Sequence, residues 1–159
     1  MTNGDFDSAH DHPQSTARIG GHPIHPMLVP FPIVGFVGAF LADVMYTLNG
    51  GPAWASASHW LLGLGLAFAV LAAVTGLTDF FGNERVRRLS DALKHMLANV
   101  TAVVLEIVNL LLRLGNDDFI PGTGVYLSGI VVLILLYSGW KGGDLVYKHG
   151  VGVYDRRQG

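Results

Sequence analysis

The residues of this chain that could do chemistry are histidines, carboxylates and an arginine set among apolar side chains. Six residues follow one another at intervals of four and three: His95, Asn99, Ala102, Glu106, Asn109 and Arg113. On an α-helix this spacing places all six on one face. Five of the six are polar, whereas the residues between them are mostly leucine and valine. Lipid cannot solvate such a face, so the stripe predicts a membrane helix whose polar side is covered by other helices.

Two further histidines each precede a proline in the segment GHPIHP, where His22 and His25 lie three residues apart. A residue before proline is biased towards extended backbone, and three residues make one turn of a polyproline helix. The two imidazoles are therefore expected to lie side by side, next to the start of the first apolar stretch. Imidazole is a common ligand of haem iron, copper, zinc and non-haem iron.

The helical rise of about 1.5 Å per residue sorts the polar residues by depth into two layers. The predicted inner layer consists of His22, His25, Asp79, His95 and Asn99. The predicted outer layer consists of Asp43, His59, Asn109 and Arg113. Asp43 and Arg113 are expected to form an ion pair, because an unpaired charge at membrane depth costs a few kcal/mol or more. Glu106 lies between the layers and has no assigned partner.

The inner layer suits two kinds of cofactor site. Haem b needs two axial ligands from different elements, which His95 with either His25 or His22 would supply. The three histidines with Asp79 would instead form a mononuclear zinc or iron site. In the structural alternative, these side chains form hydrogen bonds that hold the HPIHP segment on the bundle, and Asp79 caps backbone groups. The outer charges likewise either relay protons or only fix the packing of the helices.

Several other function classes are excluded by composition. The chain has no cysteine, which removes disulfides, iron–sulfur ligation and thiolate catalysis. It has neither an HExxH motif nor a serine beside a credible histidine and aspartate pair, so we expect a binding or anchoring subunit more than an enzyme by itself. The net charge of −2 gives no basic surface for nucleic acid.

The elements that must position these residues are membrane helices. Of the 159 residues, 50% are hydrophobic and only 14% are charged, against about 25% charged in a typical soluble domain. Four apolar stretches have lengths suited to a bilayer, at about residues 27–48, 59–81, 93–114 and 124–141. The predicted fold is an all-α, antiparallel up-and-down four-helix bundle over residues 19–154. A disordered polar tail is expected at 1–18 and a C-terminal tail at 155–159.

The lysine and arginine residues predict how the bundle is oriented. With four spans, both termini and the middle connector share one side of the membrane. That side holds nine of the ten basic residues: Arg18, Arg85, Arg87, Arg88, Lys94, Lys141, Lys148, Arg156 and Arg157. Only Arg113 falls on the other side. Positive charge concentrates in cytoplasmic segments, so both termini are expected in the cytoplasm.

Four motifs carry a resemblance to a known family. They are GHPIHPMLVPFPI at the first span, HW at His59, TDF at Thr78, and the closing GGDLVYKHGVGV. With these motifs the chain resembles a family of small bacterial membrane proteins, the domain of unknown function 2231, over about residues 20–153. The resemblance implies a bacterial inner membrane protein. Some relatives are joined to a Rieske-type iron–sulfur domain, which implies membrane redox chemistry and, in this cysteine-free chain, a separate iron–sulfur or other redox partner.

These observations favour a small redox-linked membrane subunit that binds haem b or a transition-metal ion through His22, His25 and His95. The first alternative is a non-catalytic assembly or anchoring subunit without a cofactor, whose polar core is structural. The second alternative is a proton or ion conduit, formed as a homo-oligomer through faces of glycine and alanine.

Overall fold

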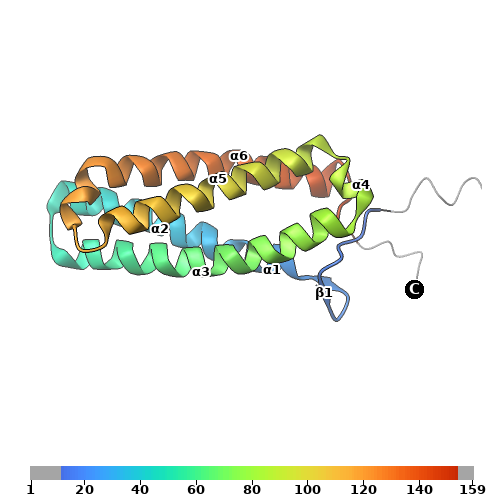
Figure 1. The fold of residues 1–159 in the computed structure, drawn as a ribbon, viewed down its shortest axis with the longest axis horizontal. Coiled ribbons are helices and arrows are strands. Elements are labelled where there is room, and N and C mark those ends of the chain that lie inside the picture. Colours follow the sequence, from blue (N-terminus) through green and yellow to red (C-terminus); the bar gives the residue numbers. More distant parts are fainter. Residues whose placement is uncertain (1–11, 154–159) are drawn as a thin grey trace, which may run out of the picture.

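The computed structural model describes residues 12–153 of the chain. The elements, in order, are β1 (Arg18–Ile19), β2 (His22–Pro23), α1 (Ile24–Leu28), α2 (Pro30–Asn49), α3 (Pro52–Gly82), α4 (Glu84–Arg87), α5 (Ser90–Arg113), η1 (Asp117–Phe119), η2 (Ile120–Gly124) and α6 (Val125–Tyr147). In this part of the chain, four helical segments are long and apolar enough to cross a membrane: Ile24–Asn49, Pro52–Gly82, Ser90–Arg113 and Asp117–Tyr147. They lie side by side (Figure 1). The prediction of an all-α membrane bundle is therefore confirmed.

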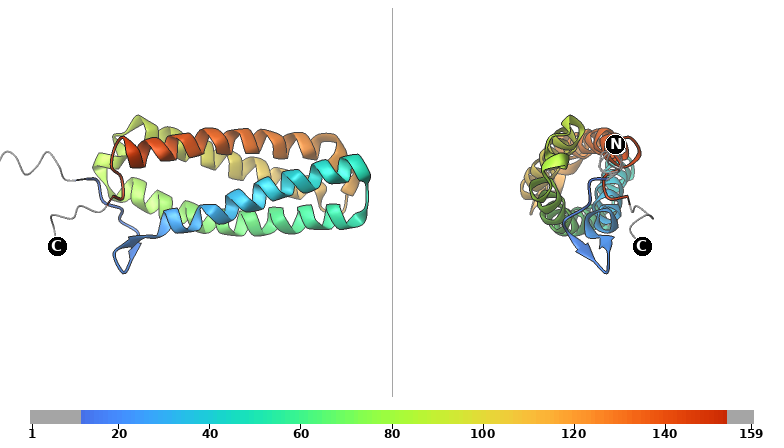
Figure 2. Two further views of the ribbon diagram at one scale, coloured as in Figure 1. Left: turned by 180° about the vertical axis from the view of Figure 1, so that it is seen from behind. Right: turned by 90° about the vertical axis from the view of Figure 1, so that its right-hand side faces the viewer.

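The four spans form a square in which each helix contacts its neighbours. The helix α2 packs against α3 and α6, and α5 packs against the same two helices. Successive spans run in opposite directions, so both ends of the described chain lie at one end of the bundle (Figure 1; Figure 2). We call this the terminal end. The opposite end, which holds the α2–α3 turn and the η1–η2 connection, is the distal end.

The first span differs locally from the sequence-based expectation. His22 is extended in β2, but His25 lies inside the short helix α1, so no polyproline turn runs through both residues. A helix is tolerated here because Pro26 is the third residue of α1, where a backbone N–H would have no intrahelical acceptor. The bond from Val29 N to His25 O, at 3.1 Å, carries the chain from α1 into α2.

Small residues set how closely the spans approach one another. A Cβ atom added to Gly35 on α2 would lie only 2.6 Å from the Cα atom of Gly65 on α3, so the two backbones are almost in contact. The apolar core occupies the middle of the bundle and consists of Phe36, Ala39, Leu62, Leu66, Ala69, Ala102 and Val131. Large apolar side chains such as Leu41, Val74 and Leu133 point outward and are exposed, as a lipid-facing surface requires.

The terminal end is crossed by the segment before the first span. Residues 12–17, which the sequence assigns to a disordered tail, lie across this end and continue into the β1–β2 hairpin (Figure 1). The closing segment returns to the same place, where Gly152 N donates to Pro13 O at 2.9 Å. The other residues of the two predicted tails, 1–11 and 155–159, lie outside the described residues.

Candidate functional site

The distal polar layer corresponds to the predicted outer layer and is built around an ion pair between two helices. Arg113, the last residue of α5, and Asp43 on α2 are both fully buried. Arg113 Nη1 donates to Asp43 Oδ1 at 2.8 Å, and Nη2 donates to Asp43 Oδ2 at 3.0 Å. This fork-to-carboxylate geometry is the strongest form of a charge pair between side chains.

Two serines and an asparagine complete the distal layer. Ser58 on α3 donates to Asp43 Oδ1, and Ser128 on α6 donates to Asp43 Oδ2 at 2.6 Å. Asn109 Oδ1 accepts from Arg113 Nε and Nη2 at 3.2 and 2.6 Å. Each oxygen of Asp43 thus has two donors, and all four spans contribute a side chain to this layer. A buried ion pair needs such additional hydrogen bonds to offset its desolvation.

The sequence interpretation missed Ser58 and Ser128. Each is a single hydroxyl in a mostly apolar helix, and both are fully buried. Depth along the helix is the one sequence signal for Ser58, because it precedes His59, which the sequence places in the outer layer. Serine is common on membrane helices at packing contacts, so a lone serine does not identify a polar partner.

His59 lies at the edge of the distal layer and not within it. Its Nδ1 contacts the Ala55 carbonyl at 2.8 Å, and its Nε2 is 3.3 Å from the Arg113 carbonyl. The exposed carboxylate of Asp117 is 3.9 Å away. His59 therefore joins the end of α5 to α3 through backbone groups.

Glu106 is the least satisfied side chain of the stripe. It is fully buried, one turn below Asn109 on α5. Its Oε2 accepts from Asn109 Nδ2 at 2.8 Å. Its Oε1 is buried and has no hydrogen-bond partner among the described residues. A buried polar atom without a partner is rare and calls for a physical reason.

The terminal polar layer contains a pair of histidines from different elements. The rings of His25 on α1 and His95 on α5 have centroids 6.1 Å apart and planes at 87°. His25 Nδ1 lies 2.8 Å from the Ala72 carbonyl on α3, and His95 Nδ1 lies 2.8 Å from the Ser138 carbonyl on α6. A carbonyl oxygen can only accept, so each ring donates a proton from Nδ1. We call His25 and His95 the histidine pair.

Each ring of the histidine pair rests on a glycine of a neighbouring helix. A Cβ atom at Gly76 on α3 would lie 2.9 Å from His25 Cε1 and Nδ1. A Cβ atom at Gly142 on α6 would lie 3.2 Å from His95 Cε1. These two glycines therefore form a cradle for the imidazoles, which a larger residue would fill.

Asn99 and Ser138 complete the surroundings of His95. Asn99 Nδ2 lies 3.1 Å from His95 Nε2 and donates to the His95 carbonyl at 2.9 Å. The Ser138 hydroxyl lies 3.0 Å from His95 Nδ1. His95 is therefore held on both ring nitrogens, whereas His25 is held on Nδ1.

Asp79 is engaged by the segment that crosses the terminal end. Its Oδ1 accepts from the Ser15 hydroxyl at 2.8 Å and from the backbone N–H groups of Thr16 and Ala17 at 2.7 and 2.8 Å. This carboxylate caps a loop. Within residues 12–153, no group of three or more histidine and acidic side chains is placed to hold a metal ion.

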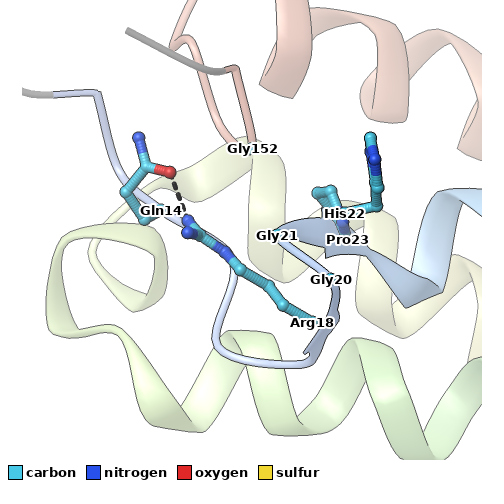
Figure 3. A pocket seen from close by; sticks show the side chains of 7 residues that line it. All are labelled: Gln14, Arg18, Gly20, Gly21, His22, Pro23 and Gly152. Atoms are coloured by element: carbon cyan, nitrogen blue, oxygen red, sulfur yellow. Dashed lines mark hydrogen bonds between the residues drawn. The ribbon is translucent and has the colours of Figure 1, made fainter. Parts of the chain in front are cut away.

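His22 lies on the hairpin and lines a surface pocket. The other lining residues are Gln14, Arg18, Gly20, Gly21, Pro23 and Gly152 (Figure 3). The Arg18 guanidinium donates to the side chain of Gln14, which lies in the segment before the hairpin (Figure 3). His22 is exposed in β2 and forms part of this outer pocket.

A group of ion pairs at the terminal end joins α5 to α6. Lys141 Nζ lies 2.9 Å from Asp91 and 3.0 Å from Asp144. His149 Nε2 lies 3.2 Å from the other oxygen of Asp91. Asp144 is buried near the end of α6, and Lys148 lies 2.6 Å from it. These contacts close the bundle beside the histidine pair.

Comparison with known proteins gives one family. Residues 21–155 match the family described as "Predicted membrane protein (DUF2231)". Neither the curated proteins nor the solved structures include a match to the chain.

Proposed function

The chain belongs to the DUF2231 family of predicted membrane proteins, and on that premise we propose a small redox-linked subunit that binds haem b or a transition-metal ion. The ligands are His25 and His95. The observation that carries the proposal is the perpendicular pair of imidazoles, which come from separate elements and have their ring centroids 6.1 Å apart.

This separation fits two imidazoles bound to one metal ion. Histidine nitrogens bind such ions at about 2.0–2.1 Å, so the two rings would hold the group between the elements that carry them. Both Nδ1 atoms already bond to backbone carbonyls. Metal-ligating histidines characteristically bond in this way, because the contact fixes the ring and increases the electron donation of Nε2.

The donor set favours a site with two protein ligands. Asp79 is occupied by Ser15, Thr16 and Ala17, and His22 lines the surface pocket. His25 and His95 would hold a haem b or a transition-metal ion such as iron or copper, for which imidazole is a suitable ligand. When bound, either group would supply one-electron transfer within the membrane.

Neighbouring residues would orient the two rings and make room for them at this site. The carbonyls of Ala72 and Ser138 hold both rings in the required tautomer. Asn99 Nδ2, which contacts both His95 Nε2 and the His95 carbonyl, would give up its contact with Nε2 when a ligand takes that position. Gly76 and Gly142 leave room for the two rings themselves, which pack against them.

The decisive experiment is an optical and metal analysis of the full chain purified in mild detergent. We expect a Soret band or a bound transition metal, present in the parent and lost in both His25→Ala and His95→Ala. The matched control is His149→Ala, which removes a terminal-end histidine that contacts Asp91 and not the pair.

Two results would contradict the proposal. The first is a parent protein that contains neither haem nor metal, even when haemin or copper is supplied during expression. That result would favour the alternative of an anchoring subunit without a cofactor. Loss of the cofactor in His149→Ala as readily as in His95→Ala would mean that binding depends on the general integrity of the terminal end.

We propose further that the terminal end faces the cytoplasm of a bacterial cell, where a separate iron–sulfur or other redox protein would meet it. The support is charge. Seven basic residues of the described chain lie towards this end: Arg18, Arg85, Arg87, Arg88, Lys94, Lys141 and Lys148. Among the basic residues that the structure describes, Arg113 alone lies at the distal end, where Asp43 neutralises it.

Cysteine labelling tests this orientation, because the chain has no cysteine of its own. The single variants are Ser56→Cys, at an exposed position near the distal start of α3, and Arg87→Cys, at an exposed position of the terminal end. An impermeant thiol reagent applied to intact spheroplasts is expected to label Ser56→Cys alone. Labelling of Arg87→Cys alone would reverse the orientation.

A further inference from the structure

Glu106 is a buried carboxyl group that takes no part in the proposed site at the histidine pair. It is fully buried in the middle of the membrane span, and its Oε1 has no partner among the described residues. The charged groups facing it are Asp43 from α2 and Arg113 from its own helix, which already neutralise each other. From α3 and α6, the neighbouring polar groups of this layer are the hydroxyls of Ser58 and Ser128.

An ionised Glu106 would therefore add an uncompensated negative charge to the bundle interior. Moving such a charge out of water is costly, whereas a neutral carboxylic acid is far less so. Asn109 satisfies Oε2 as an acceptor at 2.8 Å. The unpartnered Oε1 is then the atom left to carry a proton.

The surroundings of Glu106 are polar on one side only. Towards the distal end, Asn109 Nδ2 reaches Ser128 Oγ at 2.9 Å, and Ser128 reaches Asp43 at 2.6 Å. Towards the terminal end, the next residue of the stripe is Ala102, which is packed in the apolar core. Asn109 Nδ2 thus donates to both Glu106 and Ser128, so polar groups lie between Glu106 and the distal layer. On the other side, apolar side chains separate Glu106 from Asn99.

We propose that Glu106 is a reversible proton-binding site that exchanges protons with the distal side of the membrane. In uptake, a proton bonds to Oε1 and the side chain changes from a carboxylate to a neutral acid. In release, the O–H bond breaks, the proton passes to a water molecule that reaches Oε1 from the distal side, and the carboxylate is restored. This assignment is independent of any cofactor at the histidine pair.

The test is infrared spectroscopy of the full chain in lipid nanodiscs, in the region where protonated carboxyl groups absorb. The expected band shifts in D₂O and disappears reversibly as the pH is raised. It is absent in Glu106→Gln and unchanged in Glu84→Gln, which alters an exposed carboxylate paired with Arg88. A band common to the parent and Glu106→Gln, or no band at any pH, would overturn the proposal.

Three further measurements keep the proposal testable. Should Glu106→Gln not accumulate, Glu106→Asp retains the carboxyl and is expected to move the band; an unmoved band assigns it to another residue. Exchange of K⁺ for Na⁺ at constant pH is expected to leave the band intact, and its loss would identify a cation site instead. The band is also expected to survive in His95→Ala, which separates this site from the cofactor proposal.

The distal route is tested by the rate of deuterium exchange at the same band. Ser128→Ala removes the hydroxyl between Asn109 and Asp43 and is expected to slow exchange several-fold. Thr101→Ala removes an exposed hydroxyl of α5 that donates to the Leu97 carbonyl of the same helix, and is expected to have no effect. Equal rates in the parent and Ser128→Ala would rule out the distal route.

Discussion

At the scale of single residues, the distal ion pair is tolerated in the membrane because its hydrogen bonds are complete. Asp43 receives two bonds from Arg113 and one each from Ser58 and Ser128. Buried charges of this kind stabilise a fold only as a set, since removing one partner leaves the other without compensation.

Arg113→Met is accordingly expected to lower the free energy of unfolding by about 3–5 kcal/mol, because it leaves the Asp43 carboxylate buried and unpaired. The double variant Asp43→Leu/Arg113→Met should recover much of that loss. Both are measured by reversible denaturation in mixed detergent micelles. A double variant no more stable than Arg113→Met would show that the stability depends on the hydrogen-bonded layer and not on charge balance.

At the scale of elements, glycines decide where helices touch and where side chains fit between them. Gly35 brings α2 against the backbone of α3, whereas Gly76 and Gly142 make room for the rings of the histidine pair. Gly63 and Gly139 lie on α3 and α6, and an added methyl group there would meet nothing within 4 Å. Alanine substitutions at Gly63 and Gly139 therefore serve as controls for the same substitution at the tightly packed glycines.

Gly35→Ala is expected to destabilise the bundle by about 1–3 kcal/mol, the usual range for overpacking. The new methyl group would lie 2.6 Å from Gly65 Cα and 2.9 Å from the Leu61 carbonyl, and neither backbone atom can move aside easily. The same change at Gly63 should leave the denaturation midpoint almost unchanged. Equal midpoints for the two variants would argue that α2 and α3 pack less tightly than these distances indicate.

Gly142→Ala is expected to reduce cofactor occupancy severalfold without loss of the folded protein, because its methyl group would press on His95 Cε1 and Nδ1 at 3.2 and 3.4 Å. The comparison is Gly139→Ala, one turn earlier on α6. The Soret band or metal content per protein gives the readout. The assignment of His95 as a ligand fails if both variants retain the occupancy of the parent.

At the scale of the whole molecule, two polar layers lie at opposite ends of an apolar middle. Residues at the two ends share no partner among the described residues, and sites of that kind more than about 10 Å apart usually contribute independently to stability. Each layer can therefore be altered without disturbing the other.

Asp79→Ala tests this independence. The change removes the acceptor for Ser15, Thr16 and Ala17, so hydrogen exchange at the backbone amides of Thr16 and Ala17 should increase. Peptides around Asn109 and Arg113 should exchange as in the parent. Increased exchange at both ends would mean that the terminal segment contributes to the stability of the entire bundle.

The sequence predicts the fold class well and the site in part. The spacing on α5 identifies a buried face, and depth along the helices brings Asp43 and Arg113 to the same level. Depth does not fix lateral position, however, so it placed His22 and Asp79 with the histidine pair, whereas the structure directs them to the hairpin and the terminal segment. The carbonyls of Ala72 and Ser138 could not be found from residue types, because backbone acceptors are the same at every position.

The helix α5 is held by polar contacts near both of its ends. His95 bonds to α6 at the terminal end, and Arg113 bonds to α2, α3 and α6 at the distal end. A piston shift of one helical turn, about 5.4 Å, would break both sets of contacts at once. Alternating access by sliding of this helix would therefore require the loss of the buried polar bonds at both of its ends. The buried polar contacts at both ends therefore fix the position of α5 along its axis relative to α6.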